Sequence, residues 1–374
     1  MSGAAQSGAS REPAADRAPR EDPAALERFV RAMPKVELHV HLEGAMRPST
    51  LLDLARRNRV PLPADDVDSL RDWFVFRDFD QFVEVYLACS RALKRPEDFQ
   101  RLLDDFAADQ ERENIRYTEV HFTIGTHWMW GVPVDEILDA MTETIVAIER
   151  DRGTVLRLIP DIVRNVGNRT ADPTLDWALE GHERGVVVAL GLTGHEALHA
   201  SEPYADHFAE AARQGLHCTA HAGEHAGPQS IHSVLDACRA ERVGHGVRAI
   251  EDDGLIDRLR RLRTPLEVCP TSNLCLQMAP DLAHHPFDRL RRAGLEVSVN
   301  TDDPALFNTD LSREMLNLSA TFGYNADELG SLALAAARHS FLPEARKANL
   351  IEEIRAGIQR AAERELGREL VLSA

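Results

Sequence analysis

The feature that most constrains the fold is a regular alternation of short apolar runs and longer helical patterns, which begins near Leu26. Most of the apolar runs are rich in Val, Ile and Leu without a clean two-residue period, as expected for parallel strands buried on both faces. The predicted strands cover residues 35–40, 115–123, 155–159, 185–190, 215–220, 242–244, 265–268 and 294–300. Eight strands in alternation with helices predict a (β/α)8 TIM barrel.

Helical patterns fill the intervals, at residues 49–57, 96–113, 133–151, 173–184, 204–214, 229–239, 252–263 and 286–292. A doubly wound open sheet is the alternative, but no GxGxxG motif follows the first predicted strand. An aromatic segment at 73–86 is predicted to form a helical lid insertion after strand one. Residues 326–366 are predicted to form extra C-terminal helices.

The chain divides into a short tail and one domain. Residues 1–24 are rich in Ala, Ser, Gly, Pro and charged side chains and lack apolar periodicity, so we expect a disordered tail. Residues 25–374 contain no long internal linker and are predicted to form a single barrel domain.

Composition narrows the class of partner. The formal net charge is −18, which argues against nucleic acid and against an anionic membrane surface, because both bind basic proteins. No apolar stretch approaches the length of a membrane span, and the first residues contain no apolar signal core. Five cysteines without zinc-ribbon or CxxC spacing favour a reducing compartment, so we expect a cytoplasmic protein. The sequence does not predict the oligomeric state.

Reactive side chains follow the ends of the apolar runs, which is where barrel enzymes build their active sites. His39 and His41 are two residues apart on the first predicted strand, so both side chains point the same way and can reach one metal ion. An HxH pair alone is weak, because exposed or hydrogen-bonded histidines give the same pattern. His221 follows the fifth strand, and a glycine turn at 223 brings Glu224 back toward the same end of the barrel.

Two more clusters complete the set. His245 stands between two glycines after the sixth strand, where a tight turn is the alternative to a ligand-binding position. Asp302 and Asp303 follow the eighth strand, where adjacent carboxylates need a cation unless they cap the helix before Pro304.

Three imidazoles and one carboxylate together make a nitrogen-rich set suited to zinc. These candidate ligands are His39, His41, His221 and Asp302. A bound zinc ion would lower the pKa of its water to about 7, leaving His245 and Glu224 as acid–base groups for hydrolysis at an electrophilic carbon. The only lysines are Lys35, Lys94 and Lys347, and none ends a middle strand. A lysine bridge between two metals is therefore absent, which favours one Zn²⁺ per chain.

Five motifs in order resemble those of the adenosine/adenine deaminase family of the metal-dependent amidohydrolase superfamily. They are MPKVELHVHLEG at 33–44, HAGE at 221–224, GHG at 244–246, CPTSN at 269–273 and NTDDP at 300–304. The resemblance runs from about residue 31 to about residue 343, so it covers most of the chain.

The resemblance implies a role for each candidate residue. His39, His41, His221 and Asp302 would hold the metal, while His245 would orient its water and Glu224 would protonate a ring nitrogen of the purine. Asp303 and the backbone of Gly194 would bind the base, and Glu43 would lie on the sugar side. The implied reaction removes the 6-amino group of adenosine or 2′-deoxyadenosine as ammonia, with a small purine as the partner.

The substrate signals are mixed. Glu43 stands where many adenosine deaminases carry Asp, whereas Gly244 and the LTGHE run at 192–196 are closer to the nucleoside enzymes than to adenine deaminases. A carboxylate on the sugar side would repel a 5′-phosphate, so nucleotides are disfavoured. Adenine, or a 5′-modified adenosine such as aminodeoxyfutalosine, is the alternative substrate. Less favoured are another amidohydrolase reaction, which two metals would support, and a non-catalytic binding relative.

Several aromatic and histidine side chains allow two interpretations. Phe79, Phe82 and Tyr86 fall at helical spacing and fit core packing or a lid over the purine. Trp130, after the second strand, fits a wall of the pocket or a surface loop. His121 is expected to be a hydrogen-bonded core residue, and His285 is expected to be solvated.

Overall fold

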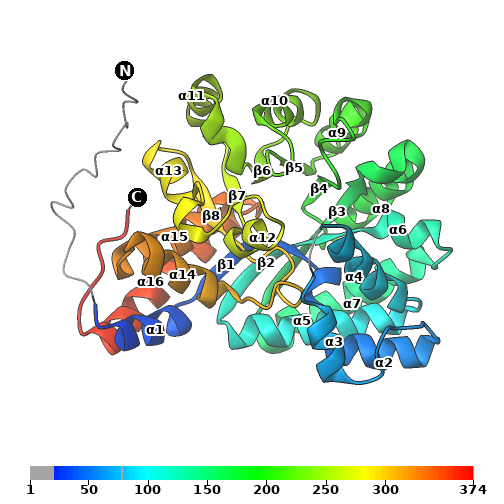
Figure 1. The fold of residues 1–374 in the computed structure, drawn as a ribbon, viewed down its shortest axis with the longest axis horizontal. Helices are drawn as coiled ribbons and strands as arrows, with labels where there is room; N and C mark the ends of the chain where they lie inside the picture. The colour runs from blue at the N-terminus through cyan, green and yellow to red at the C-terminus, as the bar shows by residue number, and fades with distance from the viewer. Residues whose placement is uncertain (1–20, 77–78, 374) are drawn as a thin grey trace, which may run out of the picture.

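Eight parallel strands lie in chain order in one sheet and form a nearly closed barrel with helices around it, as the alternation predicts (Figure 1). The structure is a computed structural model that describes residues 21–76 and 79–373. The strands are β1 (Lys35–His41), β2 (Ile115–Phe122), β3 (Val155–Val163), β4 (Ala189–Thr193), β5 (His217–Ala222), β6 (Arg242–His245), β7 (Leu266–Val268) and β8 (Val297–Val299).

Backbone hydrogen bonds join the end of β1 to the segment after β8. The N–H of His41 donates to the carbonyl of Asp302 at 2.7 Å, and the N–H of Asp302 donates to the carbonyl of His39 at 3.1 Å. Residues that lie more than 250 positions apart in the chain thereby become neighbours in a parallel bridge. The seam of the barrel therefore lies inside the candidate metal cluster.

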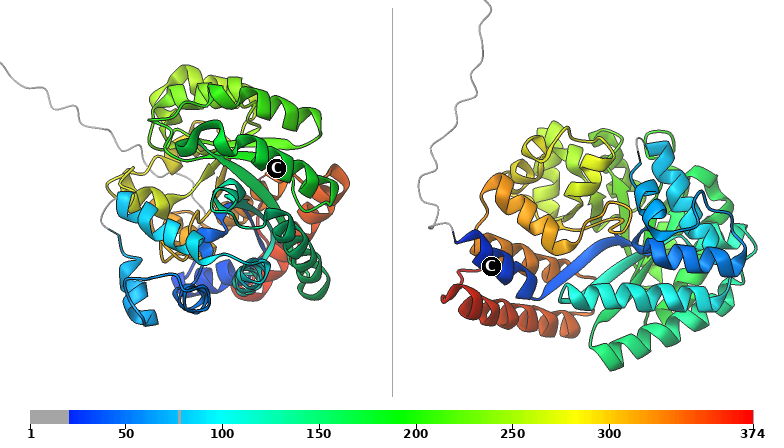
Figure 2. Two further views of the ribbon diagram at one scale, coloured as in Figure 1. Left: turned by 90° about the vertical axis from the view of Figure 1, so that its right-hand side faces the viewer. Right: turned by 60° about the horizontal axis from the view of Figure 1, so that its bottom comes forward.

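Helices surround the barrel (Figures 1 and 2). Their buried residues follow the three- and four-residue spacing of an amphipathic helix. In α5, for example, Phe99, Leu103 and Phe106 are buried. The α-helices are α1 (Pro23–Ala32), α2 (Pro48–Asn58), α3 (Val67–Trp73), α4 (Phe79–Ala92), α5 (Pro96–Arg112), α6 (Ile124–Met129), α7 (Val134–Arg152), α8 (Ala171–Glu183), α9 (Ala205–Arg213), α10 (Pro228–Ala237), α11 (Asp253–Leu262), α12 (Pro270–Cys275), α13 (Phe287–Arg292), α14 (Leu311–Phe322), α15 (Ala326–His339) and α16 (Glu344–Leu366).

Element boundaries differ from the predictions where a local signal was missed. Gly185 adopts a left-handed turn (φ 77°) after α8, so the regular part of β4 begins at Ala189 and ends beyond the predicted segment. Before this start, Val186 and Val188 are joined to β3 by backbone hydrogen bonds with Leu158. The C-terminal pattern forms two helices, α15 and α16, that are separated before Glu344 because proline 343 cannot continue a helix.

The first described helix starts inside the segment assigned to the tail. Residues 1–20 lie outside the described part of the chain, but α1 begins at Pro23. The Asp22 side chain accepts the N–H of Ala25 at 3.0 Å, and a proline in the first turn needs no hydrogen-bond partner for its nitrogen. The predicted boundary at residue 24 is therefore late by two residues. In the described ranges, no helix is long and apolar enough to cross a membrane.

A buried carboxylate couples the outer helices to pH. Glu314 on α14 accepts hydrogen bonds from the backbone N–H of Thr271 at 3.2 Å and the hydroxyl of Thr309 at 2.6 Å. Burial raises its pKa from 4.5 to about 7, although these two donors act to lower it. The folded state therefore holds this proton more tightly than the unfolded state between these pH values, so this group's stabilisation is lost as pH rises through 7.

We expect the Glu314→Gln variant to lose less stability than the parent protein between pH 5 and pH 8, because the amide cannot ionise. The difference should be about 2 kcal/mol, measured as the free energy of unfolding in urea at both pH values. Glu363→Gln, at an exposed position of α16, is the control and should keep the parental pH dependence. If the parent protein and Glu314→Gln lost the same stability between these pH values, the raised pKa of Glu314 in the folded state would be contradicted.

Candidate metal centre and active-site pocket

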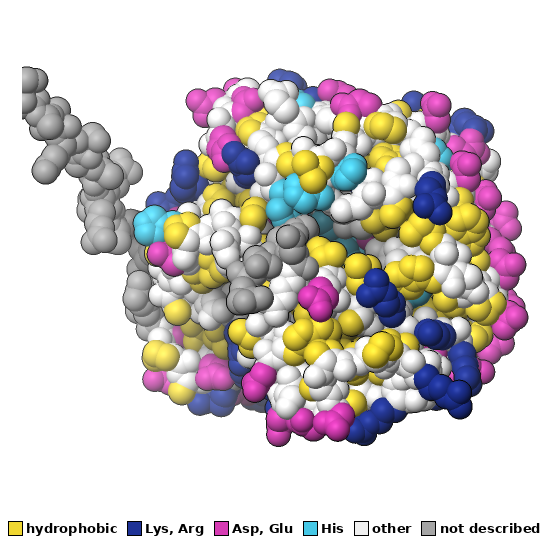
Figure 3. Space-filling view, turned by 45° about the vertical axis from the view of Figure 1, so that its right-hand side comes forward, with side chains coloured by type: hydrophobic (Ala, Val, Ile, Leu, Met, Phe, Trp, Pro, Cys, Tyr) yellow, Lys and Arg dark blue, Asp and Glu magenta, His cyan; other side chains and the backbone are white. Residues whose placement is uncertain are grey.

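Histidines from three strands meet one aspartate at the carboxyl end of the barrel. The cluster consists of His39 and His41 on β1, His221 on β5, His245 at the end of β6 and Asp302 after β8. Asp302 Oδ1 lies 3.4 Å from His39 Nε2 and 3.3 Å from His41 Nε2. The Nε2 atoms of His41 and His221 are 3.1 Å apart. Figure 3 shows histidine side chains gathered in a hollow of the surface.

Hydrogen bonds to Nδ1 fix which nitrogen of two rings is free. His39 Nδ1 lies 2.8 Å from the Oε2 atom of Glu267, and His221 Nδ1 lies 3.1 Å from the carbonyl of Leu192. Both partners only accept, so each Nδ1 carries a proton, and each Nε2 points into the cluster, where its lone pair is available to a bound cation. The Nε2 lone pairs and the Asp302 carboxylate repel each other unless a positive charge lies between them. These donor atoms therefore fit a metal ion.

The titration behaviour of the cluster agrees with this need for positive charge. Burial acts to lower the pKa of His39, but the carboxylates of Asp302 and Glu267 outweigh it and raise the pKa to about 10. Burial acts to raise the pKa of Asp302, but His39 and His41 hold it well below its usual range. The backbone is also left-handed at His245 (φ 60°) and Asp302 (φ 65°), a strained conformation that is common at functional sites.

Four ligand atoms lie close enough together to share one ion: those of His39, His221, His245 and Asp302. This group contains three of the predicted ligands and takes His245, the predicted water-orienting residue, in place of His41. His41 nevertheless contacts both His221 and Asp302. A second group, of His39, His121 and Glu267, shares His39 with the first.

A buried ion-pair network behind the cluster was missed in the sequence. Glu267 on β7 accepts a 2.5 Å hydrogen bond from Arg242 Nε as well as contacting His39, and Arg242 also pairs with Glu119 at 2.5 Å. Burial acts to raise the pKa of Glu267, but Arg242 and His39 lower it to about 2, so its charge is retained. The sequence does contain a signal for this network, because a carboxylate stands among the apolar residues of β2, β3 and β7, at Glu119, Asp161 and Glu267.

Asp161 supports the histidine that the sequence assigned to the core. Its carboxylate lies 3.0 Å from Nδ1 of His121, and both side chains are buried. His121 is therefore hydrogen-bonded inside the barrel as expected, but it lies against the metal cluster, with its ring centre 4.6 Å from that of His39.

The CPTSN motif supports the cluster from α12. The hydroxyl of Ser272 donates to Asp302 Oδ2 at 2.6 Å, and Asn273 Nδ2 lies 3.3 Å from Nδ1 of His245. Asn273 Oδ1 lies 3.1 Å from Nε2 of His285, which is buried. The prediction that His285 is solvated is therefore wrong, because a buried amide and the N–H of Phe287 bind its ring.

Glu224 follows β5 and lies beside the cluster. Its Oε2 atom is 3.7 Å from Nε2 of His245 and 3.1 Å from Nδ1 of His225. Burial acts to raise the pKa of Glu224, but the two imidazoles outweigh it and lower the pKa. The carboxylate is thus placed for proton exchange with a ligand in the cavity.

Glu196 holds the turn that carries Glu224. Its carboxylate accepts the backbone N–H groups of Gly223 at 2.8 Å, Glu224 at 2.7 Å and Ala226 at 2.8 Å, and it also accepts the hydroxyl of Ser230. Gly223 permits the turn because its φ is 67°. This role of Glu196 could not be predicted from the sequence, because its hydrogen-bond partners lie 27 or more residues away along the chain.

The cluster forms the floor of a cavity of about 400 Å³ that we call the histidine cavity. Phe82 and Tyr86 of α4 line this cavity, and a lid over the site stays a prediction; the side chain of Phe79 lies outside the described part. Trp130 lines the mouth, in agreement with the pocket-wall interpretation. Gly194 also lines the cavity, with φ 102°, and an added Cβ there would meet Asn165 Oδ1 at 2.3 Å.

The two remaining predicted residues differ in position. Asp303 lines the histidine cavity, and burial and the charge of Asp302 raise its pKa well above the usual range. Glu43 is fully buried behind the wall, where Oε1 accepts the N–H of Thr123 at 3.0 Å and the hydroxyl of the same residue at 2.5 Å. Glu43 contacts Thr123 and His127 and is not a lining residue of the cavity, so its position gives no reason to expect repulsion of a 5′-phosphate.

Comparison with known proteins is consistent with this geometry. The sequence profile of the family described as "Adenosine deaminase" matches residues 34–357. An adenine deaminase of Cupriavidus taiwanensis is 36% identical over 334 residues, which cover 88% of this chain and 94% of that protein. An aminodeoxyfutalosine deaminase of Streptomyces coelicolor is 36% identical over 333 residues, covering 89% and 86%.

A solved structure gives the same result. The chain superposes on an amidohydrolase of Burkholderia ambifaria with bound zinc at a TM-score of 0.84 and 27% identity, covering 93% of this chain and 96% of that one. The fold is therefore that of a metal-containing hydrolase barrel over nearly its whole length.

Removing the Glu267 carboxylate tests its support of the metal site. We expect Glu267→Gln to weaken metal binding by about 10–100-fold, because His39 loses the charged acceptor that orients its ring. Competition with a chelator measures the affinity, and thermal melting checks the fold. The control is Glu241→Gln, which removes a Glu–His pair of the same 2.8 Å length from an exposed site at His217 and should not change metal binding. Equal affinity in both variants would contradict the assignment.

Proposed function

The chain belongs to the adenosine deaminase family, and we propose that it is a zinc-dependent hydrolytic deaminase of a 6-aminopurine nucleoside. Water would replace the 6-amino group, giving a 6-oxopurine nucleoside and ammonia. One observation carries the proposal: Glu224 and His245 lie on the floor of a single cavity together with the histidine and aspartate cluster.

Zinc is the proposed metal because the donors are mainly imidazole nitrogens with one carboxylate, and a similar structure contains zinc. We propose one ion per chain, because both candidate ligand groups use His39. Lewis acidity, which activates water at neutral pH, is the chemistry that zinc supplies when bound there.

The chain's own residues divide the remaining work. Glu224, held by Glu196, would take a proton from the attacking water and deliver it to the ring nitrogen beside the attacked carbon. His245, whose Nδ1 accepts a hydrogen bond from Asn273, would orient the attacking water through Nε2. Asp303 and the backbone N–H of Gly194 would orient the base, since both line the cavity.

The sugar-bearing substrate is favoured over the free base by the shape and the sequence of the site. The histidine cavity continues past the base-binding floor to apolar residues of α4 and to Trp130, which a free adenine would leave uncovered. Gly244, which is closer to the nucleoside enzymes than to adenine deaminases, has no room for a side chain, because an added Cβ would lie 2.8 Å from His39 Cε1. Adenine is the second candidate substrate, because several relatives with 36% identity are named adenine deaminase.

The activity is tested with the zinc-replete protein by following the ultraviolet absorbance of the adenine ring. We expect a higher kcat/KM for adenosine, 2′-deoxyadenosine or aminodeoxyfutalosine than for adenine. A higher value for adenine would select the second candidate. Absence of turnover with all four compounds would overturn the proposed function.

Replacing the proton donor separates chemistry from metal binding. We expect Glu224→Gln to reduce kcat by a factor of at least about 100, because an amide cannot deliver the proton. Zinc content, measured by atomic emission, should stay at one per chain. The control is Glu202→Gln, which changes a carboxylate bound to Ser233 outside the cavity. Zinc loss in Glu224→Gln would show that this residue supports the metal instead.

A further inference from the structure

A groove with three cationic side chains adjoins the mouth of the histidine cavity. We call it the basic groove; it encloses about 380 Å³ and is lined by Arg59, Val60, Pro61, Arg91, Leu93, Lys94, Trp130, Gly131 and Val132. Arg91 and Trp130 also line the histidine cavity, so the two spaces meet at these side chains. The lining contains no acidic residue.

The cations of the basic groove differ from most arginines of this chain in having no carboxylate to neutralise them. Within the described residues, no ion pair or side-chain hydrogen bond is formed by Arg59, Arg91 or Lys94, and all three are exposed. Arg91 instead lies over the ring of Trp130, with its guanidinium carbon 5.6 Å from the ring centre. This contact keeps its charge at the junction between groove and cavity.

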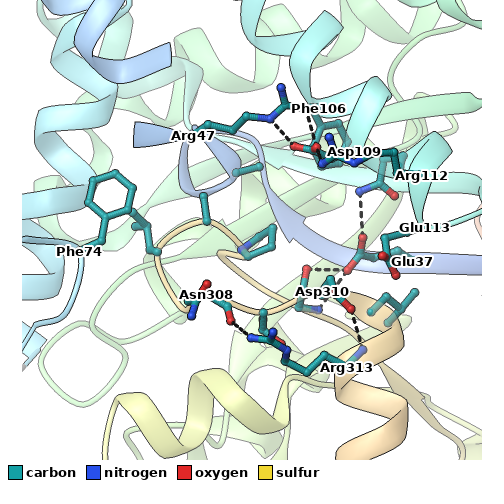
Figure 4. A pocket seen from close by; sticks show the side chains of 18 of the residues that line it. Glu37, Arg47, Phe74, Phe106, Asp109, Arg112, Glu113, Asn308, Asp310 and Arg313 are labelled. Atoms are coloured by element: carbon teal, nitrogen blue, oxygen red, sulfur yellow. Dashed lines mark hydrogen bonds and ion pairs between the residues drawn. The ribbon is translucent and has the colours of Figure 1, made fainter. Parts of the chain in front are cut away.

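A second cavity shows the contrasting arrangement. It encloses about 480 Å³ beside α5, and it too is lined by several arginines (Figure 4). There Arg47 donates to Asp109 at 2.8 Å, and Arg112 pairs with the same carboxylate. These two arginines are therefore neutralised by the protein, whereas the cations of the basic groove are left for a ligand.

We propose that the basic groove is the part of the substrate site that binds an anionic group carried beyond the 5′ carbon of the purine nucleoside. The proposal rests on the proposed function and extends it to the far end of the substrate. The floor of the histidine cavity is polar, its walls at Phe82, Val83, Leu87 and Met129 are apolar, and its mouth is cationic. A ligand that complements this sequence has a purine, then an apolar spacer, then a carboxylate or phosphate.

Charge argues for the same ligand class. The chain has a net charge of −18, so an anion approaching the molecule is repelled overall and needs local positive charge at its binding site. Three cations beside the cavity, which have no carboxylate partner among the described residues, provide that charge, and a neutral adenosine or adenine makes no use of it. The groove therefore selects among nucleosides by what lies past the sugar.

The test compares two matched substrates, 5′-deoxy-5′-(3-carboxyphenylthio)adenosine and its carboxamide, which differ in charge but hardly in size. We expect a higher kcat/KM for the carboxylate in the parent protein. Arg91→Gln should lower the carboxylate-to-carboxamide ratio by about tenfold, mainly through KM, since it removes a charge-assisted contact. The double variant Arg59→Gln with Lys94→Gln should lower the ratio in the same direction. High salt should lower it in the parent protein and leave it nearly constant in Arg91→Gln.

The control is Arg261→Gln, an exposed position on α11 away from both spaces, which should leave the ratio unchanged. AMP, assayed in parallel, distinguishes a 5′-phosphate from a more distant carboxylate: a loss with Arg91→Gln confined to AMP assigns the groove to phosphate. Equal ratios in all variants, with AMP also unaffected, would overturn the basic groove as a binding site while leaving the deaminase intact. No turnover of any purine by the parent protein would instead refute the proposed function.

Discussion

The carboxylate of Glu267 is the contact on which the metal site depends. It lies between the guanidinium of Arg242 and the ring of His39, and all three groups are buried. Arg242 keeps Glu267 ionised, and ionised Glu267 keeps the proton of His39 on Nδ1, so that Nε2 faces Asp302. A buried ion pair contributes little net stability, but here it sets the orientation of a ligand.

Much of the fold could be predicted because the barrel repeats one pattern. The strands β1, β2 and β3 each contain several apolar residues, and each is followed by an amphipathic helix, so their order alone implies parallel pairing. Boundaries were less predictable where one residue decides them. The left-handed Gly185 delays β4, and the capping side chain of Asp22 starts α1 early. Such effects arise from single backbone geometries that periodicity does not report.

The candidate site was predictable as far as its residues follow strand ends in recognisable motifs. His39, His221 and Asp302 were named from the sequence, and the structure places them in one cluster. The supporting residues were not predictable, because Glu267 and Glu196 act through partners that are distant in sequence. Glu43 is the opposite case: its motif position suggested a pocket residue, but the fold turns its carboxylate toward Thr123.

The basic groove draws its cations from a different part of the chain than the reactive residues. Arg59, Arg91 and Lys94 all belong to the segment between β1 and β2, whereas the metal cluster comes from the ends of four strands. Mutations in that segment can change the charge presented to a substrate without altering a barrel strand. Relatives with the same metal cluster can therefore differ in substrate preference through the segment between β1 and β2. This segment is the part of the sequence to compare when the substrates of related barrel enzymes are to be distinguished.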